Sequence, residues 1–416
     1  MTSFMNRLSK AIISNFSTLN EESATAFLNE ISLNKDLSKR IISWLAVSGI
    51  IPYSKTGSIL ELSRKFKEYK KMANMYELED PILINSDTHG QLECSRWNRF
   101  HSIVCGDTER TIIWFNQIYH QMNENNREEE DQITIQNSTP SCIQQENEMS
   151  ARERINRIFK FLLFENRQFS YAQGYDRFAF ATFSIAVTVF VNKYRLPFLF
   201  AEMISFWLTK EFIKMSRIKT LMGDMNFCQI HFQELDLIFS KFAPKVMNSL
   251  FDSGNSSIHF VLRWEFLLFA EEHEKIDDIL LIWDHLITKQ RNPLVFQQFL
   301  NALDIAHVIQ VTSEEGKTMM ESLQQNKKWD ILKIMKDSNA IYLNGKEKGD
   351  NDTFAKTNLP NQTFAGRIDF ENNKVDENHR NGRTNGNNDP VSPLSVATAV
   401  VVSSFCSFLL YKRINK

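Results

Sequence analysis

Apolar residues recur along this chain at the spacing of a helix. Ile155, Ile158, Phe159 and Leu162 fall at positions i, i+3, i+4 and i+7. Two later stretches repeat the pattern: Leu235, Ile238, Phe239 and Phe242, then Ile276, Ile279, Leu280 and Trp283. Only 13 Gly and 9 Pro interrupt the 416 residues, and alternating β-branched runs are few. The sequence therefore predicts an all-α fold in which each apolar stripe is buried as core.

Composition and charge narrow the class of protein. A hydrophobic content of 43% with 33 Phe predicts a packed core, enough for one large or two ordinary domains. A net charge of −2 indicates no general nucleic-acid-binding surface, so we expect no nucleic-acid partner. The five cysteines are widely spaced and form no C-x-x-C pair, which predicts neither a disulfide framework nor a zinc site and favours a reducing compartment.

The first 37 residues form a helical extension in our interpretation. Residues 1–20 are apolar and basic, with no acidic residue before Glu21. This composition fits a first helix that docks on the domain, and it is also that of a mitochondrial transit peptide. A secretory signal is not indicated, because the segment lacks its apolar central region.

Two short polar motifs interrupt the helical pattern. One runs from Val104 to Arg110 with Asp107 in between, and the other spells Y-A-Q-G from Tyr171 to Gly174. Taken singly, Asp-x-x-Arg is ordinarily a solvated ion pair on a helix, and a glutamine after a helix is ordinarily a capping or turn residue. Taken together, in this order, the motifs resemble the I-x-x-D-x-x-R and Y-x-Q-G finger motifs of the TBC family, whose members activate Rab-type GTPases.

The resemblance implies a role for each matching residue. Arg110 would be the finger that enters the partner's nucleotide site, since a guanidinium stays charged and matches phosphate oxygens two at a time. Asp107 would brace the loop that carries it. Gln173 would replace the GTPase's own water-positioning glutamine, because an amide can accept from water and donate to phosphate at once. Tyr171 would support this second finger, and Gly174 would let the backbone come close to the partner.

Four positions depart from the family pattern. Val104 stands in place of isoleucine, Cys105 and Gly106 follow it, and Arg177 comes after the second motif. Gly106 would loosen the turn that aims the arginine finger. These departures leave open a catalytically silent Rab-binding adaptor, and also a tail-anchored tether without Rab contact. The intact arginine and glutamine favour an activator, because an adaptor needs neither side chain.

The resemblance implies a helical TBC domain of two lobes over residues 38–336. Residues 39–45 resemble the opening motif of the family, in which a basic residue precedes a helical Trp and Leu. Arg263-Trp264 and Ile282-Trp283-Asp284 resemble its late helices.

Residues 123–150 are acidic, polar and without periodicity, which predicts a disordered insertion in a surface loop.

The chain carries no nucleotide site of its own in this interpretation. Gly316-Lys317-Thr318 resembles the end of a P-loop, but the first glycine of that motif would fall on Val311. A TBC protein completes the active site of a Rab in its GTP form and is not an enzyme in its own right. GTP and Mg²⁺ would therefore belong to the partner GTPase, whose identity the sequence does not specify.

The C-terminal region predicts attachment to a membrane. Residues 337–393 are rich in Asn, Gly, Asp and Lys, which predicts a disordered linker. Residues 394–411 are uncharged and precede Lys412 and Arg413, and at 1.5 Å per residue they would reach about 27 Å, enough for a thin bilayer. A buried strand is the other interpretation, which the linker disfavours because it leaves no core to join.

A transmembrane tail anchor over residues 394–411 would leave the domain in the cytosol. A TBC domain with such an anchor resembles the endoplasmic-reticulum branch of the family, which acts on Rabs of early secretory traffic. The short span and its basic end also fit the mitochondrial outer membrane or peroxisomes.

Overall fold

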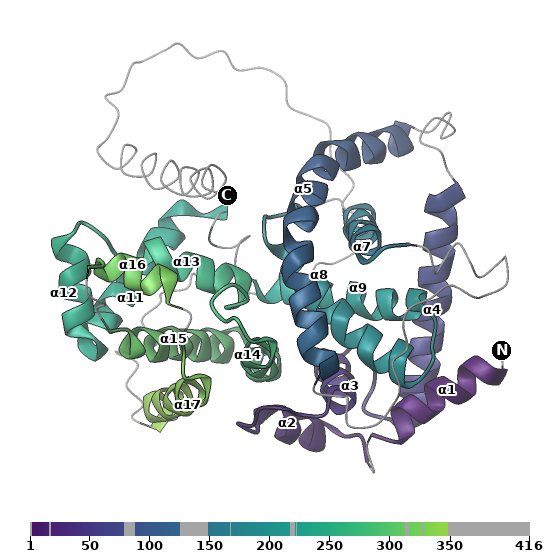
Figure 1. Ribbon diagram of the computed structural model, residues 1–416, viewed down its shortest axis with the longest axis horizontal. Helices are drawn as coiled ribbons and strands as arrows, with labels where there is room; N and C mark the ends of the chain where they lie inside the picture. The colour runs from purple at the N-terminus through teal and green to yellow at the C-terminus, as the bar shows by residue number, and fades with distance from the viewer. Residues whose placement is uncertain are drawn as a thin grey trace, which may run out of the picture.

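The computed structural model is helical throughout the part of the chain that it describes, as predicted, and that part contains no strand. It describes residues 2–15, 18–78, 88–124, 149–166, 168–216, 221, 223–312, 316–326 and 328–347. Figure 1 shows the helices in two groups that lie side by side, α1 to α9 in one and α11 to α17 in the other. One continuous set of buried apolar residues runs through both groups, which we call the first and second lobe.

The first lobe surrounds a buried central segment. Its helices are α1 (Thr2–Ile13), α2 (Glu21–Asn29), α3 (Leu37–Val47), α4 (Lys55–Leu78), α5 (Thr88–Glu124), α7 (Ala151–Glu165), α8 (Tyr175–Ala186), η1 (Val187–Lys193) and α9 (Phe198–Met215). The apolar run from Phe178 to Val191 forms α8 and the π-helical η1, and α8 packs against both α5 and α9. This confirms the prediction that the run is a buried helix too short to span a membrane.

The second lobe contains no described helix longer than 18 residues. Its helices are α11 (Met225–Phe242), α12 (Pro244–Asp252), α13 (Ile258–Leu267), α14 (Ile276–Lys289), α15 (Pro293–Gln310), α16 (Met319–Gln325) and α17 (Ile331–Glu347). Thr318 caps α16 through a reciprocal contact with Glu321, so the Gly-Lys-Thr sequence that resembled a P-loop is a helix start.

The final helix extends beyond the boundary that composition indicated. We predicted a linker from residue 337, but α17 continues to Glu347 and packs along α15. Ser338 is fully buried in this extension, and Ile341 and Tyr342 pack against the core. The apolar period thus persists past Lys336 among the polar residues that dominate the composition.

The first helix docks on the lobe, as predicted. Leu8 and Ile12 of α1 are fully buried, and the ring of Phe4 stacks on that of Phe66 in α4 at 5.1 Å between centroids. Asn15 donates to the Tyr194 hydroxyl at 2.9 Å.

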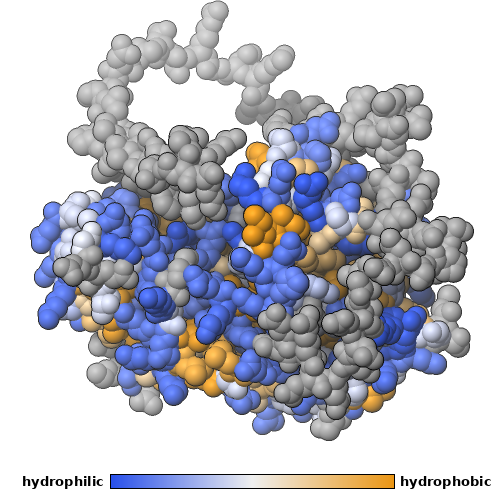
Figure 2. Space-filling view, viewed as in Figure 1, coloured by the Kyte–Doolittle hydropathy of each residue, from blue (hydrophilic) through white to orange (hydrophobic). Residues whose placement is uncertain are grey.

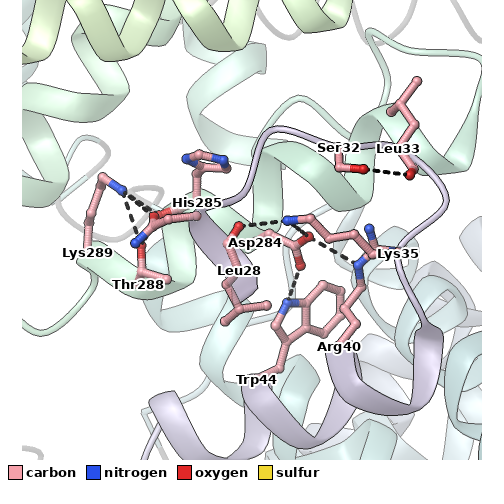
Figure 3. A network of polar contacts seen from close by, with 11 residues as sticks. Leu28, Ser32, Leu33, Lys35, Arg40, Trp44, Asp284, His285, Thr288 and Lys289 are labelled. Atoms are coloured by element: carbon pink, nitrogen blue, oxygen red, sulfur yellow. Dashed lines mark hydrogen bonds and ion pairs between the residues drawn. The ribbon is translucent and has the colours of Figure 1, made fainter. Parts of the chain in front are cut away.

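A buried carboxylate joins the start of the chain to α14 (Figure 3). Asp284 accepts from the Trp44 indole at 2.8 Å, from Arg40 Nε at 3.1 Å and from Lys35 Nζ at 3.2 Å, and all four side chains are buried. Burial lowers the pKa of Lys35, and the attraction of Asp284 opposes that shift. The opening motif and the late Trp-Asp pair, which the sequence identified separately, therefore form one contact between the lobes.

A second buried carboxylate fixes α7, the helix that leads into the Tyr171 motif. Glu202 of α9 accepts from Arg157 Nε at 2.6 Å, from Arg154 Nη1 at 2.9 Å and from the Tyr69 hydroxyl at 2.9 Å. Each donor is a strong partner for an ionised acceptor, so α4, α7 and α9 are held in one register. Sequence analysis did not identify this network.

Several predictions concern residues beyond the described ranges. The insertion assigned to 123–150 lies outside them except at its edges, where α5 runs to Glu124 and Ser150 caps α7 through Glu153. The linker after residue 347 and the anchor at 394–411 also lie outside. Among the described helices, none combines the length and the apolar character needed to cross a bilayer.

Candidate functional site

The first motif lies within the uninterrupted helix α5. Val104 is buried at 1% exposure and Asp107 at 4%, whereas the Arg110 side chain is 53% exposed and its Nη2 pairs with Asp107 Oδ1. The expectation of a loop braced by Asp107, with Gly106 loosening a turn, is wrong: residues 88–124 contain no proline, and one glycine at this place does not break a helix. The alternative of an i, i+3 ion pair on a helix does form, but only its arginine is solvated, because the Asp107 carboxylate is buried.

The second motif forms the tight turn that leads into α8. Tyr175 N donates to Ala172 O at 3.1 Å across the turn. Tyr171 is buried at 8% exposure, while Gln173 is exposed at the tip. The sequence therefore places one inward and one outward side chain within three residues.

The Tyr171 hydroxyl joins the two motifs. It lies 3.0 Å from Asp107 Oδ2, across 64 positions of sequence, and 3.3 Å from Asp176 Oδ1. The predicted residues Asp107, Arg110 and Tyr171 thus form one connected cluster, which Asp176 completes. Gln173 lies two residues beyond Tyr171 and is exposed, as Arg110 is.

Burial raises the pKa values of the acidic groups in this cluster. It raises the pKa of Asp107 to about 6, with a further rise from the nearby Asp176 carboxylate, while Tyr171 and Arg110 pull the pKa down. Burial also raises the pKa of Asp176, and it raises the pKa of Tyr171 well above its ordinary value, which keeps that hydroxyl protonated as a donor.

Gly174 serves a different contact from the one that we predicted. It caps α8 with φ at +95°, and a Cβ built there would come within 2.5 Å of Leu267 Cδ2. The close approach is therefore made by the C-terminal end of α13 in the same chain, and Gly174 is buried. Glycine is needed for both the left-handed backbone and the space.

We expect Gly174→Ala to lower the free energy of unfolding by about 2 kcal/mol, because left-handed strain adds to displacement of Leu267. Urea denaturation would measure the loss. Gly106→Ala is the matched control: its Cβ would meet Arg110 Nη1 at an ordinary 3.6 Å, so it should stabilise α5 by roughly 0.5–1 kcal/mol. Equal losses for both variants would contradict this account of Gly174.

Arg177, one of the departures from the family pattern, contacts both α5 and the turn that follows α13. Its Nη2 lies 3.4 Å from Glu271 Oε1, and its guanidinium lies 4.5 Å from the centre of the Trp114 ring on α5. With Gln117 and Gln121 these residues line an open cleft of about 630 Å³. Arg177 is thus engaged beside the cluster.

Two residues of the site were not identified from the sequence. Asp176 lies two residues after the second motif and carried no assigned role, although its carboxyl contacts the Tyr171 hydroxyl. Thr108 donates to Asn156 Oδ1 of α7 at 3.0 Å, which ties α5 to the helix before the Tyr171 turn. The Thr108 contact and the closeness of Asp176 to Asp107 have no signal in the local sequence, because both depend on how distant helices pack. Within the described ranges, no three His, Cys, Asp or Glu side chains are grouped to hold a metal ion.

The surface around Arg110 is partly apolar. Ile103 and Ile113 are 49% and 67% exposed, and they lie seven residues before and three residues after Arg110, on the same face of α5. Figure 2 shows hydrophobic surface over α5 as it lies in Figure 1, within a largely hydrophilic face.

Comparisons with known proteins agree on the fold. A family model described as the Rab-GTPase-TBC domain matches residues 96–305, just over half of the chain. Among solved structures, the chain is similar to the crystal structure of the Ypt/Rab-GAP domain of Gyp1p, with a TM-score of 0.51 and 13% identity, covering 82% of this chain and 98% of that one. No curated protein sequence matches.

Proposed function

The chain belongs to the Rab-GTPase-TBC domain family, and from this premise we propose that it accelerates GTP hydrolysis by a Rab-type GTPase by supplying Arg110 and Gln173 in trans. Its partner is the Rab in its GTP form. GTP and Mg²⁺ are held by that partner, and the chain contributes side chains to a site that it does not contain alone.

Arg110 is suited to the role of the finger by how it is held. Its Nη2 is engaged by the buried Asp107, and the rest of a half-exposed guanidinium remains available to phosphate oxygens. A cation that is ordered before the partner arrives stabilises developing charge with little reorganisation. Arginine fingers are typically worth about 10³ to 10⁵ in rate, or roughly 4 to 7 kcal/mol.

Gln173 is suited to orienting the attacking water. Its amide oxygen can accept a hydrogen bond from the water while its nitrogen donates to the phosphate. The residue is exposed at the tip of a turn whose flanks, Tyr171 and Gly174, are both buried. The turn thus presents a free side chain from a fixed backbone.

The observation that carries the proposal is the 3.0 Å contact between the Tyr171 hydroxyl and Asp107. It links the two motifs, so both exposed fingers are placed by one buried cluster. Ile103 and Ile113 add apolar contact area on the arginine's side of α5.

Single-turnover GTP hydrolysis tests the proposed function. Members of the Rab family are loaded with GTP, and the loss of γ-phosphate is followed with and without the protein. We expect at least one Rab to hydrolyse GTP about 10³-fold faster or more. No acceleration of any Rab, together with GTP-dependent binding to one of them, would favour the silent adaptor, and no binding at all would favour the tether.

We also propose that residues 394–411 anchor the protein in the endoplasmic reticulum membrane with the domain in the cytosol, where it serves vesicle-mediated transport. This rests on their uncharged sequence and the basic residues that follow. Membrane-held Rab and activator share a high effective concentration, which supports activity in cells.

A fluorescent reporter fused to residues 390–416 should localise to the endoplasmic reticulum when it is imaged in cells. A diffuse cytosolic signal would contradict the anchor itself. A signal at mitochondria or peroxisomes would contradict only the choice of membrane.

A further inference from the structure

The hydrogen bonds around Tyr171 cannot all form without an additional proton. Its hydroxyl lies 3.0 Å from Asp107 Oδ2 and 3.3 Å from Asp176 Oδ1, but it carries a single hydrogen. If both carboxyls were ionised, one of these contacts would place lone pairs against lone pairs. Both contacts become hydrogen bonds when one carboxyl is protonated and donates to the Tyr171 oxygen.

A bridging water does not fit between the Tyr171 hydroxyl and Asp176 Oδ1, which are 3.3 Å apart, and bulk solvent hardly reaches either carboxyl, because Asp107 is 4% and Asp176 1% exposed. The charged groups nearby favour keeping the negative charge on Asp107, which pairs with Arg110 of the same helix. Asp176 faces mixed surroundings: Arg177 attracts its charge, Glu271 repels it, and its buried Oδ2 has no hydrogen-bond partner among the described residues. In the fully bonded form, therefore, the proton belongs on Asp176 and the charge on Asp107.

We infer that Asp176 is a positioning residue for Arg110, because the proton it holds leaves the Tyr171 hydrogen free to fix Asp107, which in turn holds the finger. The inference rests on the proposed function. With the proton present, Asp176 donates to Tyr171, Tyr171 donates to Asp107, and Asp107 accepts from Arg110. Without that proton, the second carboxylate competes for the Tyr171 hydrogen. The hydrogen bond from Tyr171 to Asp107 then weakens, and Asp107 holds Arg110 less firmly.

The raised pKa values of Asp107 and Asp176 place the loss of this proton within an experimentally accessible pH range. The pKa of Asp107 is raised to about 6 and that of Asp176 is also raised, so the pair holds a proton in the folded protein under conditions where the unfolded chain has lost it. A raised carboxyl pKa stabilises the fold below the ordinary value near 3.8. Because the two carboxyls titrate as a coupled pair, this stability is lost as the pH rises through their raised pKa values, of which that of Asp107 is about 6.

The test is the pH profile of stimulated hydrolysis for Asp176→Asn against the wild type. An asparagine amide can donate to Tyr171 at every pH, so it mimics the protonated acid. With a responsive Rab, and with the Rab's intrinsic rate subtracted, wild-type kcat/KM should fall about tenfold between pH 5.5 and 7.5. Asp176→Asn should hold the low-pH value throughout, while the exposed Asp252→Asn should follow the wild type.

Identical pH profiles for Asp176→Asn and the wild type would overturn the inference while leaving the proposed function intact. An absence of stimulation at every pH would instead overturn the proposed function. Urea denaturation from pH 5 to 7 reports the proton without any Rab: wild-type stability should decline with rising pH, and Asp176→Asn should decline less. Parallel declines would show that the pair holds no proton.

Discussion

Arg110→Ala and Gln173→Ala are each expected to lower Rab GTP hydrolysis by about 10²-fold or more, with the fold intact. Both side chains are exposed, so their truncation leaves no cavity and no buried polar group unpaired except at the Arg110 contact with Asp107. Both act on one transition state, so the double variant should lose less than the product of the single losses. Single-turnover hydrolysis would measure the rates, and thermal melting would confirm folding.

Two matched variants sharpen this prediction. Glu109→Ala removes a neighbouring side chain that is 73% exposed and only loosely paired with Arg152 at 4.0 Å, and it should keep full activity. Arg110→Lys keeps the charge but loses the planar fork. If the lysine variant matched the wild type, bidentate contact with phosphate would be the wrong mechanism.

Asp284→Ala should cost about 3–5 kcal/mol of folding free energy, because it leaves Lys35 and Arg40 buried without their carboxylate and the Trp44 indole without an acceptor. That is a large share of the roughly 5–15 kcal/mol that stabilises an ordinary domain. The loss should also weaken the contact between α14 and the opening helices. Urea denaturation monitored by tryptophan fluorescence would measure it.

Two matched controls separate the cost of leaving buried cations unpaired from the cost of removing an aspartate as such. The exposed Asp252→Ala should change stability by less than about 0.5 kcal/mol. Adding Lys35→Met to Asp284→Ala should recover part of the loss, because it removes one uncompensated buried cation. A change below about 1 kcal/mol for Asp284→Ala alone would contradict a stabilising role for the network.

Much of the fold could be predicted because its signals are local. The stripe from Ile155 to Leu162 became α7, and the apolar run from Phe178 became the buried α8 and η1. Composition could not locate the end of the domain, because the apolar residues of α17 that pack on the core lie among polar residues. The contact of Asp284 with Arg40 spans 244 positions and depends on how α3 and α14 pack, which no local pattern encodes.

The candidate site was predictable in its residues but not in its geometry. The spacing of Asp107 and Arg110 and the intact Y-x-Q-G motif identified the side chains that lie in or beside one cluster. The roles of the supporting residues differed, because Asp107 is braced by Tyr171 within a continuous helix and Gly174 makes room for Leu267. Asp176 was missed because its importance comes from a carboxylate 69 positions away in sequence.

The most direct test of the central claim is binding to a GDP-loaded Rab with and without aluminium fluoride, which mimics the phosphoryl group in transfer. A protein that supplies fingers to the transition state should bind at least about 10²-fold more tightly when the mimic is present. Arg110→Ala and Gln173→Ala should each remove most of that gain. Equal affinity with and without aluminium fluoride, unchanged in both variants, would contradict the claim and identify the protein as an adaptor.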